Sequence, residues 1–293
     1  WINQNEKYFY PKLVKGKHLG SIDDFNMFKH VNKNLKSDPL YPFIEKLSKN
    51  PNKPPRDLLN ETYFDLFENE FKIPRKKISF YRHEDCHKIY GLFSKPKKPG
   101  KTLIFTCEGG GDDSSATISI YDNNTIKEIW SSNNCSLGRL YRNVTIYMGM
   151  KPGLDEYKIM GLAPYASSKQ GQKALDFFRE IDEVNGISIE RKKKHKDLYY
   201  SMSKYLKGVR FDGIAWAIQK YLEEMLLKWM ENTIKQTNIH KIIFSGGVAQ
   251  NIKAMKVLCE SSLVDNFWVG PITGDGSLGI GAAALGLKEK HNI

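Results

Sequence analysis

The 293-residue sequence has few cysteines and no long hydrophobic run, and each absence excludes a class of protein. Its four cysteines are scattered without a Cys-x-x-Cys pair, which favours reduced thiols over a disulfide framework. No segment approaches the roughly 18 consecutive apolar residues that a membrane helix needs, and no signal peptide opens the chain. We therefore expect a cytoplasmic protein that does not associate with a membrane.

The P-loop motif and a recognisable nucleic-acid module are also missing. The pattern G-x-x-x-x-G-K-[ST] does not occur, and the glycine turn at residue 246 does not match G-x-G-x-x-G, so we do not expect a P-loop or Rossmann fold. Basic residues outnumber acidic ones by 45 to 33, and the resulting formal net charge of +12 could neutralise phosphates. The lysines, however, are spread over loops and helix faces without interleaved aromatic residues, so a nucleic-acid partner is not favoured.

What the sequence does contain is a globular composition with alternating strand and helix patterns. With 40% hydrophobic residues, it can build one large domain or two lobes. Apolar spacing predicts helices at residues 56–71, 137–150, 211–237, 252–259 and 279–286. Strands are predicted at residues 77–81, 101–107, 116–121, 241–245 and 266–270. This mixture indicates an α/β fold, in which the second and third strands form a hairpin through a glycine-rich turn.

His83 and His87 are the first candidate functional residues. Four positions apart in the segment Arg-His-Glu-Asp-Cys-His-Lys, they project from one face of a helix and can bind one metal ion. Many helices carry such a pair on a solvated or core face for no chemical reason. Two carboxylates in later glycine turns, Glu108 and Asp275, extend the pair to a mixed nitrogen and oxygen ligand set. Such a set suits Fe(II), Mn(II) or Zn(II) better than calcium or magnesium.

Glycine-rich turns follow three of the predicted strands. Gly246 and Gly247 connect the 241–245 strand to a helix, and this geometry presents backbone N–H groups and a helix N-terminus to an anion. A single turn of this kind has another explanation, because glycine is often required there only to allow a positive φ angle. Together, the turns at Gly246, around Asp275 and after Glu108 are typical of the phosphate- and adenosine-holding turns of actin-like nucleotide-binding folds.

Several segments of the sequence together resemble one enzyme family. They are the His-x-x-x-His pair, the acid-Gly-x-Gly hairpin, Ser-Leu-Gly-Arg-Leu-Tyr at 136–141, Met-Gly-Met-Lys-Pro at 148–152, Glu-Tyr-Lys-Ile-Met-Gly-Leu-Ala-Pro-Tyr at 156–165, Ser-Gly-Gly-Val-Ala-Gln-Asn at 245–251 and Gly-Asp-Gly at 274–276. In this order they resemble the NodU/CmcH-type O-carbamoyltransferases, relatives of the tRNA threonylcarbamoyladenosine enzymes. The resemblance runs from about residue 80 to residue 286.

The resemblance implies an actin-like (ASKHA) fold of two lobes, with mixed sheets flanked by helices. Residues 1–98 would be the remaining part of the first lobe, including the His-x-x-x-His helix, and residues 99–293 the second lobe with the nucleotide turns. The chain begins with Trp1, without the family's opening strands, and no YrdC-like domain follows. We expect a fragment, truncated at both ends, of a longer protein that carries the YrdC-like domain.

The resemblance also implies a reaction. In this family the YrdC-like domain makes carbamoyl adenylate from carbamoyl phosphate and ATP, and the actin-like domain transfers the carbamoyl group to a hydroxyl and releases AMP. The acceptor would be a sugar or a natural product. His83, His87, Glu108 and Asp275 match the family's metal ligands, usually for iron, with Glu108 standing where Asp is usual. The adenylate would be held by the glycine-turn residues Gly109, Gly110, Gly246, Gly247, Val248, Asn251 and Gly274.

Lys158 and Arg139 are the candidate catalytic residues, as charge partners for the phosphate, although an ordinary ion pair explains each of them equally well. The reaction has two alternatives: a transferase of the tRNA threonylcarbamoyladenosine type and an actin-like sugar or acetate kinase. The basic charge mildly favours the first alternative, whereas a kinase would need Mg-ATP and no histidine pair. A degenerate binding subunit is the non-enzymatic alternative.

Overall fold

The computed structural model of the chain describes residues 55–97, 99–112, 114–193, 195 and 198–291. It divides into two compact units, residues 1–80 and residues 81–293. The predicted boundary after residue 98 refers to the lobes of an actin-like fold and stays a prediction, and residues 1–54 of the predicted first lobe lie outside the described residues. No helix in the described ranges is both long and apolar enough to cross a membrane.

Two helices make up the described part of the first unit: α5 (Pro55–Asn69) and the short 3-10 helix η3 (Arg75–Lys77). Arg75 forms an ion pair with Asp65 of α5, and its guanidinium group lies over the ring of Phe64. Phe80 contacts the same ring edge to face, with the ring centroids 4.9 Å apart. The segment that follows α5 is therefore held against the helix that precedes it.

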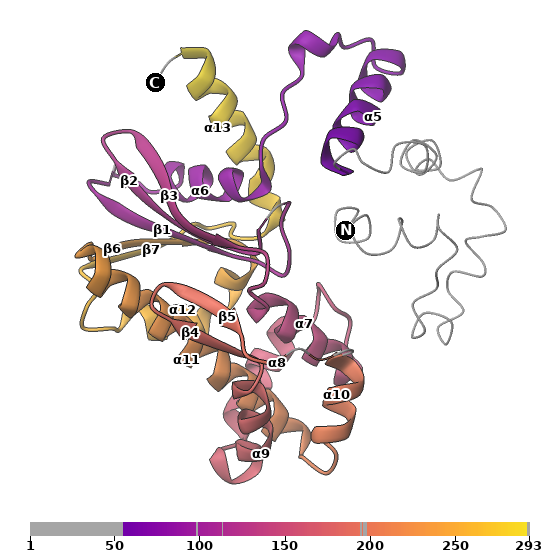
Figure 1. Ribbon diagram of the computed structural model, residues 1–293, viewed down its shortest axis with the longest axis vertical. Helices are drawn as coiled ribbons and strands as arrows, with labels where there is room; N and C mark the ends of the chain where they lie inside the picture. The colour runs from indigo at the N-terminus through magenta and orange to yellow at the C-terminus, as the bar shows by residue number, and fades with distance from the viewer. Residues whose placement is uncertain (1–54, 98, 113, 194, 196–197, 292–293) are drawn as a thin grey trace, which may run out of the picture. The chain divides into compact units, whose positions relative to one another are not determined.

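The second unit is built on a mixed five-stranded sheet with the strand order β3-β2-β1-β6-β7 (Figure 1). Its strands are β1 (Thr102–Cys107), β2 (Ala116–Asp122), β3 (Thr125–Ser132), β6 (Lys241–Ser245) and β7 (Asn266–Val269). The first three strands pair antiparallel, whereas β6 pairs parallel with both β1 and β7. The predicted α/β fold with a mixed sheet is confirmed, and so is the glycine-turn hairpin of β1 and β2.

Helices cover both faces of this sheet and extend beyond it. The described helices of the second unit are α6 (His83–Phe93), α7 (Leu137–Tyr147), α8 (Glu156–Leu162), α9 (Ser168–Arg179), α10 (Leu198–Tyr205), α11 (Phe211–Thr237), α12 (Ile252–Cys259) and α13 (Leu278–His291). Three short 3-10 helices join them: η4 (Ala163–Tyr165), η5 (Gly247–Gln250) and η6 (Asp275–Ser277). Helices α6 and α13 lie on one side of the sheet, and α11 and α12 on the other (Figure 1).

The central strand β1 is buried along its whole length because both faces of the sheet are covered. Its successive side chains point to opposite faces. Leu103 and Phe105 enter the large core that α11 and α12 share, whereas Ile104 joins a smaller cluster with Ile243 of β6 and Leu92 of α6. The end of β1 therefore lies between two helical layers, and Glu108 follows it directly.

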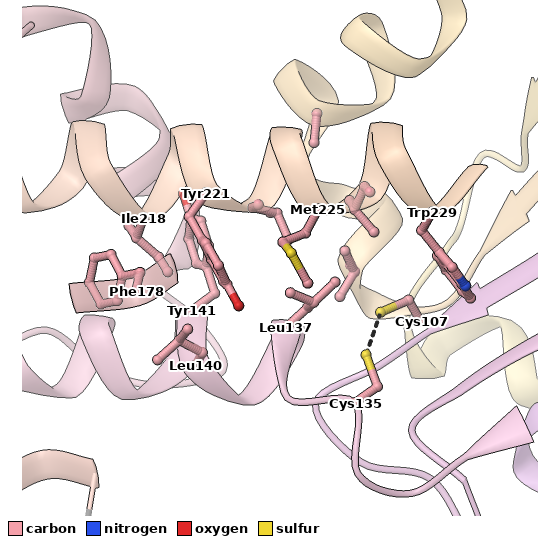
Figure 2. Close-up of a cluster of buried hydrophobic side chains, with 14 of the residues drawn as sticks. Cys107, Cys135, Leu137, Leu140, Tyr141, Phe178, Ile218, Tyr221, Met225 and Trp229 are labelled. Carbon is pink, nitrogen blue, oxygen red and sulfur yellow. Dashed lines mark hydrogen bonds between the residues drawn. The ribbon is translucent and has the colours of Figure 1, made fainter. Parts of the chain in front are cut away.

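Helix α11 carries the main core of the second unit. One face presents Ile218, Tyr221, Met225 and Trp229 to α7, α9 and the sheet (Figure 2). Trp229 contacts Phe105 of β1 edge to face, with the ring centroids 4.9 Å apart. Asn238 follows the last residue of the helix, and its φ of 54° lies in the left-handed region that commonly terminates α-helices. The predicted buried helix at residues 211–237 is confirmed at both ends.

One predicted strand is absent, and several elements were not predicted. Ile78 is extended after η3, but residues 78–81 form no strand and pair with none in the part of the chain that the structure describes. The unpredicted elements are β3, α9, α10 and the separate hairpin of β4 (Asp182–Asn185) and β5 (Ser188–Arg191). The basic run at residues 191–195, predicted as a loop between helices, therefore begins in a strand.

Close backbone packing holds α6 in place. A Cβ at Gly281 of α13 would lie 2.2 Å from the carbonyl oxygen of Cys86, so only glycine lets the two helices approach this closely. On the other side of α6, a Cβ at Gly91 would lie 2.7 Å from Cγ2 of Ile243. The predicted small-residue helix therefore serves backbone packing against the histidine helix.

Replacing Gly281 with alanine should destabilise the second unit, although alanine normally stabilises a helix interior. Crowding against Cys86 should lower the free energy of unfolding by about 1–3 kcal/mol, measured by urea denaturation. Gly279→Ala is the matched control, because a Cβ at Gly279 would meet nothing within 4 Å. Equal stability of the two variants would show that the contact at Gly281 is not tight.

Candidate metal centre

Helix α6 brings the two histidines to one point. Its first turn carries Glu84 and Asp85, which favour the positive end of the helix dipole. The spacing of four residues places both rings on one side, with the Nε2 atoms of His83 and His87 3.1 Å apart. His87 is fully buried, because α6 packs between the sheet and α13. The predicted histidine face is therefore turned into the unit.

Two carboxylates from distant segments reach the same point. Glu108, directly after β1, places Oε1 2.7 Å from His87 Nε2 and 3.8 Å from His83 Nε2. Asp275, the first residue of η6, places Oδ1 3.6 Å from His83 Nε2 and 3.9 Å from His87 Nε2. One donor atom from each of the four residues lies within 4.8 Å of the others. The structure thus brings together all four residues predicted to bind a metal.

Glu108 is an ionised carboxylate in a buried position. Burial raises a carboxyl pKa, but the hydrogen bonds and charges of His83 and His87 outweigh burial and hold the pKa of Glu108 at about 2. In turn, burial lowers the pKa of His83, whereas Glu108, Asp275 and Glu84 raise it above the ordinary value. The carboxylates of Glu108 and Asp275 therefore attract positive charge to the site.

Ser277 determines which nitrogen of His87 faces the centre. Its hydroxyl donates to the carbonyl oxygen of Gly274 at 2.9 Å, so its lone pair accepts the Nδ1 proton of His87 at 3.1 Å. The proton on Nδ1 leaves a lone pair on Nε2, which points at Glu108 and His83. An outer hydrogen bond that sets the tautomer in this way is usual for histidines that bind metals.

The donor set fits a divalent transition metal. The Nε2 lone pair of His87 and the carboxylate oxygen of Glu108 repel each other at 2.7 Å unless a positive charge lies between them. A proton or a metal ion can supply that charge. Two imidazoles with two carboxylates favour Fe(II), Mn(II) or Zn(II) over calcium or magnesium. The identity of the metal stays a prediction.

Three glycines make room for Glu108. A Cβ at Gly138, in the first turn of α7, would lie 2.7 Å from the carbonyl group of Glu108. A Cβ at Gly246 would lie 2.9 Å from Oε1, and one at Gly247 would lie 2.8 Å from Oε2. Gly246 also has a φ of 93°, which disfavours other residues. The N–H of Gly247, predicted to face a nucleotide, donates to Glu108 Oε1 at 2.7 Å.

A cavity of about 250 Å³ lies next to these glycines. Gly138 and Gly247 line it on the side of Glu108, together with Val248 and Asn251 of the glycine turn. Glu156, Tyr157 and Met160 of α8 also line it. The Tyr-Lys-Ile-Met-Gly segment and the Ser-Gly-Gly-Val-Ala-Gln-Asn segment therefore meet at one cavity. No ligand role of a cavity residue follows from this placement alone.

The remaining predicted nucleotide residues surround the centre without lining the cavity. The carbonyl oxygen of Gly109 accepts a hydrogen bond from Arg139 Nε at 3.3 Å. Gly110 lies half-buried in the turn after Glu108, and Gly274 packs so closely on Gln250 that a Cβ would meet its Nε2 at 2.4 Å. Asn251, which does line the cavity, caps α12 with its side chain by accepting the N–H of Ala254. Their roles toward a nucleotide stay predictions.

The two predicted catalytic residues occupy different surroundings. Arg139, on α7, reaches the glycine turn after Glu108 through its bond to Gly109. Lys158, on α8, is exposed and pairs with Asp155 at a distance of 2.9 Å. The hydrogen bond that Lys158 donates to Asp155 raises the pKa of Lys158 above its ordinary value. Neither side chain lines the cavity, and both catalytic roles stay predictions.

Three residues around the centre were not predicted: Ser277, Glu84 and Asp112. Ser277 lies two positions after Asp275 and bonds to His87, and the spacing Asp-Gly-Ser was the available signal. Asp112 accepts the backbone N–H of His83 at 2.9 Å, and Glu84 accepts the backbone N–H of Ser114 at 3.0 Å. No sequence pattern links these last two pairs, because each joins segments about 30 positions apart.

Comparison with known proteins agrees with these motifs. Residues 20–284 match the family described as Carbamoyltransferase N-terminus, which is most of the chain. The chain belongs to this carbamoyltransferase family. The family assignment covers every segment that forms the centre and the cavity.

The chain spans less than half the length of the curated relatives that it matches. The uncharacterized protein MJ1051 of Methanocaldococcus jannaschii is 30% identical over 224 residues, which are 74% of this chain and 42% of that protein. Nodulation protein NolNO of Sinorhizobium fredii is 28% identical over 231 residues, which are 76% of this chain and 34% of NolNO. Full-length HypF, in its phosphate- and nucleotide-bound crystal form, is 15% identical with a TM-score of 0.42 over 82% of this chain and 42% of HypF.

Removing the Ser277 hydroxyl should weaken metal binding without removing a ligand. Ser277→Ala frees His87 to place its proton on Nε2, so we expect an affinity for Zn(II) that is lower by about tenfold, measured by competition with a chromogenic chelator. Ser245→Ala is the matched control, because the buried Ser245 hydroxyl has no hydrogen-bond partner within the described residues. Unchanged affinity in Ser277→Ala would contradict the assigned tautomer.

Proposed function

We propose that this chain is the metal- and adenylate-binding part of an O-carbamoyltransferase. Its substrate would be carbamoyl adenylate, which a YrdC-like domain of the longer protein makes from carbamoyl phosphate and ATP, and its acceptor would be a hydroxyl of a sugar or a natural product. The observation that carries the proposal is the convergence of His83, His87, Glu108 and Asp275 beside a cavity that includes the glycine turn. Family membership supports the transfer of a carbamoyl group.

The four converging residues would hold one divalent metal, with iron as the first candidate. Bound there, the metal would supply Lewis acidity toward a phosphate or carbamoyl oxygen. The hydrogen bond of Ser277 orients His87 for this role, and the N–H of Gly247 orients the Glu108 carboxylate. Asp275 is more exposed than the other three residues, so it lies on the solvent side of the site.

The chain's own residues would bind and orient the two substrates. Val248 and Tyr157 would contact the adenylate in the cavity, and Arg139 would lie near its phosphate through its position over Gly109. In the transfer, the acceptor oxygen bonds to the carbamoyl carbon and the acceptor gives up its proton. The bond from that carbon to the phosphate oxygen breaks, and AMP leaves with the bonding electrons.

Substituting either histidine should remove most of the bound metal. In His83→Ala or His87→Ala the site loses an imidazole ligand, and we expect metal content measured by plasma mass spectrometry to fall from about one equivalent by at least about tenfold. His240→Ala is the control, because the His240 ring bonds to the Leu263 carbonyl oxygen and to Asn238, far along the chain from the four ligands. Unchanged stoichiometry in both α6 variants would rule out this centre.

The full-length protein should release AMP from ATP when carbamoyl phosphate and a hydroxylated acceptor are present. Incubation with a panel of sugars and natural products, followed by chromatography of nucleotides and carbamoylated products, measures the reaction. Asp275→Asn removes one charged ligand, and we expect it to slow product formation by at least about tenfold. If no acceptor of the panel leads to AMP release, the proposed acceptor class is contradicted. Transfer to tRNA adenosine instead would also contradict it.

A further inference from the structure

Two carboxylates tie the histidine helix to the loop that follows β1. The Asp112 carboxylate, in the loop, accepts the N–H of His83 at the start of α6 at 2.9 Å. The Glu84 carboxylate, in α6, accepts the N–H of Ser114 in the loop at 3.0 Å. Each segment therefore supplies one carboxylate and one backbone donor. We call this reciprocal pair of hydrogen bonds the clasp.

The clasp lies directly beside two metal-binding residues. Asp112 bonds to the backbone of His83 itself, and Glu84 is the next residue of the helix. On the loop side, Ser114 precedes Ser115, whose carbonyl oxygen accepts the N–H of Glu108 at 2.8 Å. Two consecutive hydrogen bonds thus connect α6 to Glu108.

The loop needs such a restraint because of its composition. Gly109, Gly110 and Gly111 follow Glu108 without interruption, and glycine has the largest backbone freedom of any residue. Fixing these residues costs conformational entropy, which bonds at the end of the run offset. The clasp supplies them at Asp112 and Ser114, immediately after the three glycines.

Gly111 shows that the clasp is tightly packed. A Cβ at this position would lie 2.2 Å from Glu84 Oε1 and 2.4 Å from the carbonyl oxygen of Ser114. Glu84 is only 1% exposed, and a carboxylate buried to this extent is costly unless it is hydrogen-bonded or paired. Its second oxygen, Oε2, faces Arg82 Nε at 4.0 Å. The Glu84 carboxylate therefore packs against the backbone of residue 111 so closely that only glycine, which has no Cβ, fits at that position.

The rest of α6 is anchored independently of the clasp. Lys88, which is 2% exposed, bonds to Asp85 at 2.9 Å and to Glu128 of β3 at 2.6 Å. Gly91 packs on β6 and Gly281 packs on Cys86, as described above. These contacts keep the helix in the unit when the clasp is opened. The loss of the clasp should therefore affect the position of Glu108 more than the fold.

We propose that Glu84 and Asp112 are positioning residues that set the distance between Glu108 and the two histidines and thereby the metal affinity of the centre. They act through the backbone of His83 and Ser114 and do not bind the metal themselves. This inference rests on the proposed metal centre. It adds these two residues, and Gly111, which packs on Glu84 and Ser114, to those on which metal binding would depend.

The test compares the metal affinity of clasp variants of the full-length protein. Glu84→Ala, Asp112→Ala and Gly111→Ala each open the clasp and leave all four ligands in place. We expect each to raise the dissociation constant for Zn(II) and Co(II) by about tenfold to a hundredfold in competition with a chelator. The visible spectrum of bound Co(II) should change in the same variants, because the ligand geometry is altered.

Conservative and matched variants separate positioning from general damage. Glu84→Gln and Asp112→Asn retain an oxygen acceptor, so we expect dissociation constants within about threefold of the wild type. Gly279→Ala, a glycine replacement beside the other ligand-bearing segment, should leave the affinity unchanged, because a Cβ there meets nothing within 4 Å. Thermal melting in EDTA identifies any variant that does not fold. The positioning role is then judged from the metal affinities of the clasp variants that do fold.

Each outcome has a distinct meaning. If the wild-type protein binds neither metal, the proposed centre is wrong. A second outcome is that the wild type binds metal and that every folded variant with an opened clasp, Gly111→Ala included, binds it with the same affinity as the wild type. In that case the centre stands and the positioning role is wrong. If the conservative variants lose as much affinity as the alanine variants, the carboxylate charge and not the clasp geometry is responsible, and the inference is overturned.

Discussion

The second unit is organised around one electrostatic constraint, the close approach of Glu108 to His83 and His87. An ionised oxygen and two imidazole nitrogens within 3.8 Å of one another repel unless positive charge lies among them. The surrounding elements are arranged to hold these atoms in place. Gly138, Gly246 and Gly247 leave room for the carboxylate, and the close packing of α6 on α13 prevents the histidines from moving away.

The sequence was informative wherever a local pattern carried the structure. Helix α11 was predicted at both ends because its apolar spacing continues over many turns and Asn238 terminates it. The β1–β2 hairpin and the strand–glycine–helix order at β6 followed from similar local signals. The four candidate ligands were found because the histidine spacing is a short-range pattern and the two carboxylates occupy recognisable glycine turns. The family comparison agrees with the segments that suggested it.

The rest depended on tertiary contacts that no local pattern encodes. Residues 77–81 have the composition of a strand, but a strand forms only with a neighbour to pair with, and none of the described strands lies beside them. The N–H of Gly247, predicted to bind a nucleotide, also donates to Glu108, and no local pattern encodes that contact. The role of Gly247 toward a nucleotide stays a prediction. Ser277 reaches His87 across 190 positions, so only the folded chain reveals that bond.

The parallel pairing of β1 with β6 has a kinetic consequence. Glu108 and its Gly247 partner are 139 positions apart, so their contact closes a long loop, and contacts of this kind form slowly. The two histidines are adjacent on α6 as soon as that helix exists, whereas the carboxylates arrive only after the sheet has assembled. If the proposed centre binds a metal, a weak two-histidine site would therefore precede the complete one during synthesis or refolding, and tight metal binding would mark the pairing of the central strands.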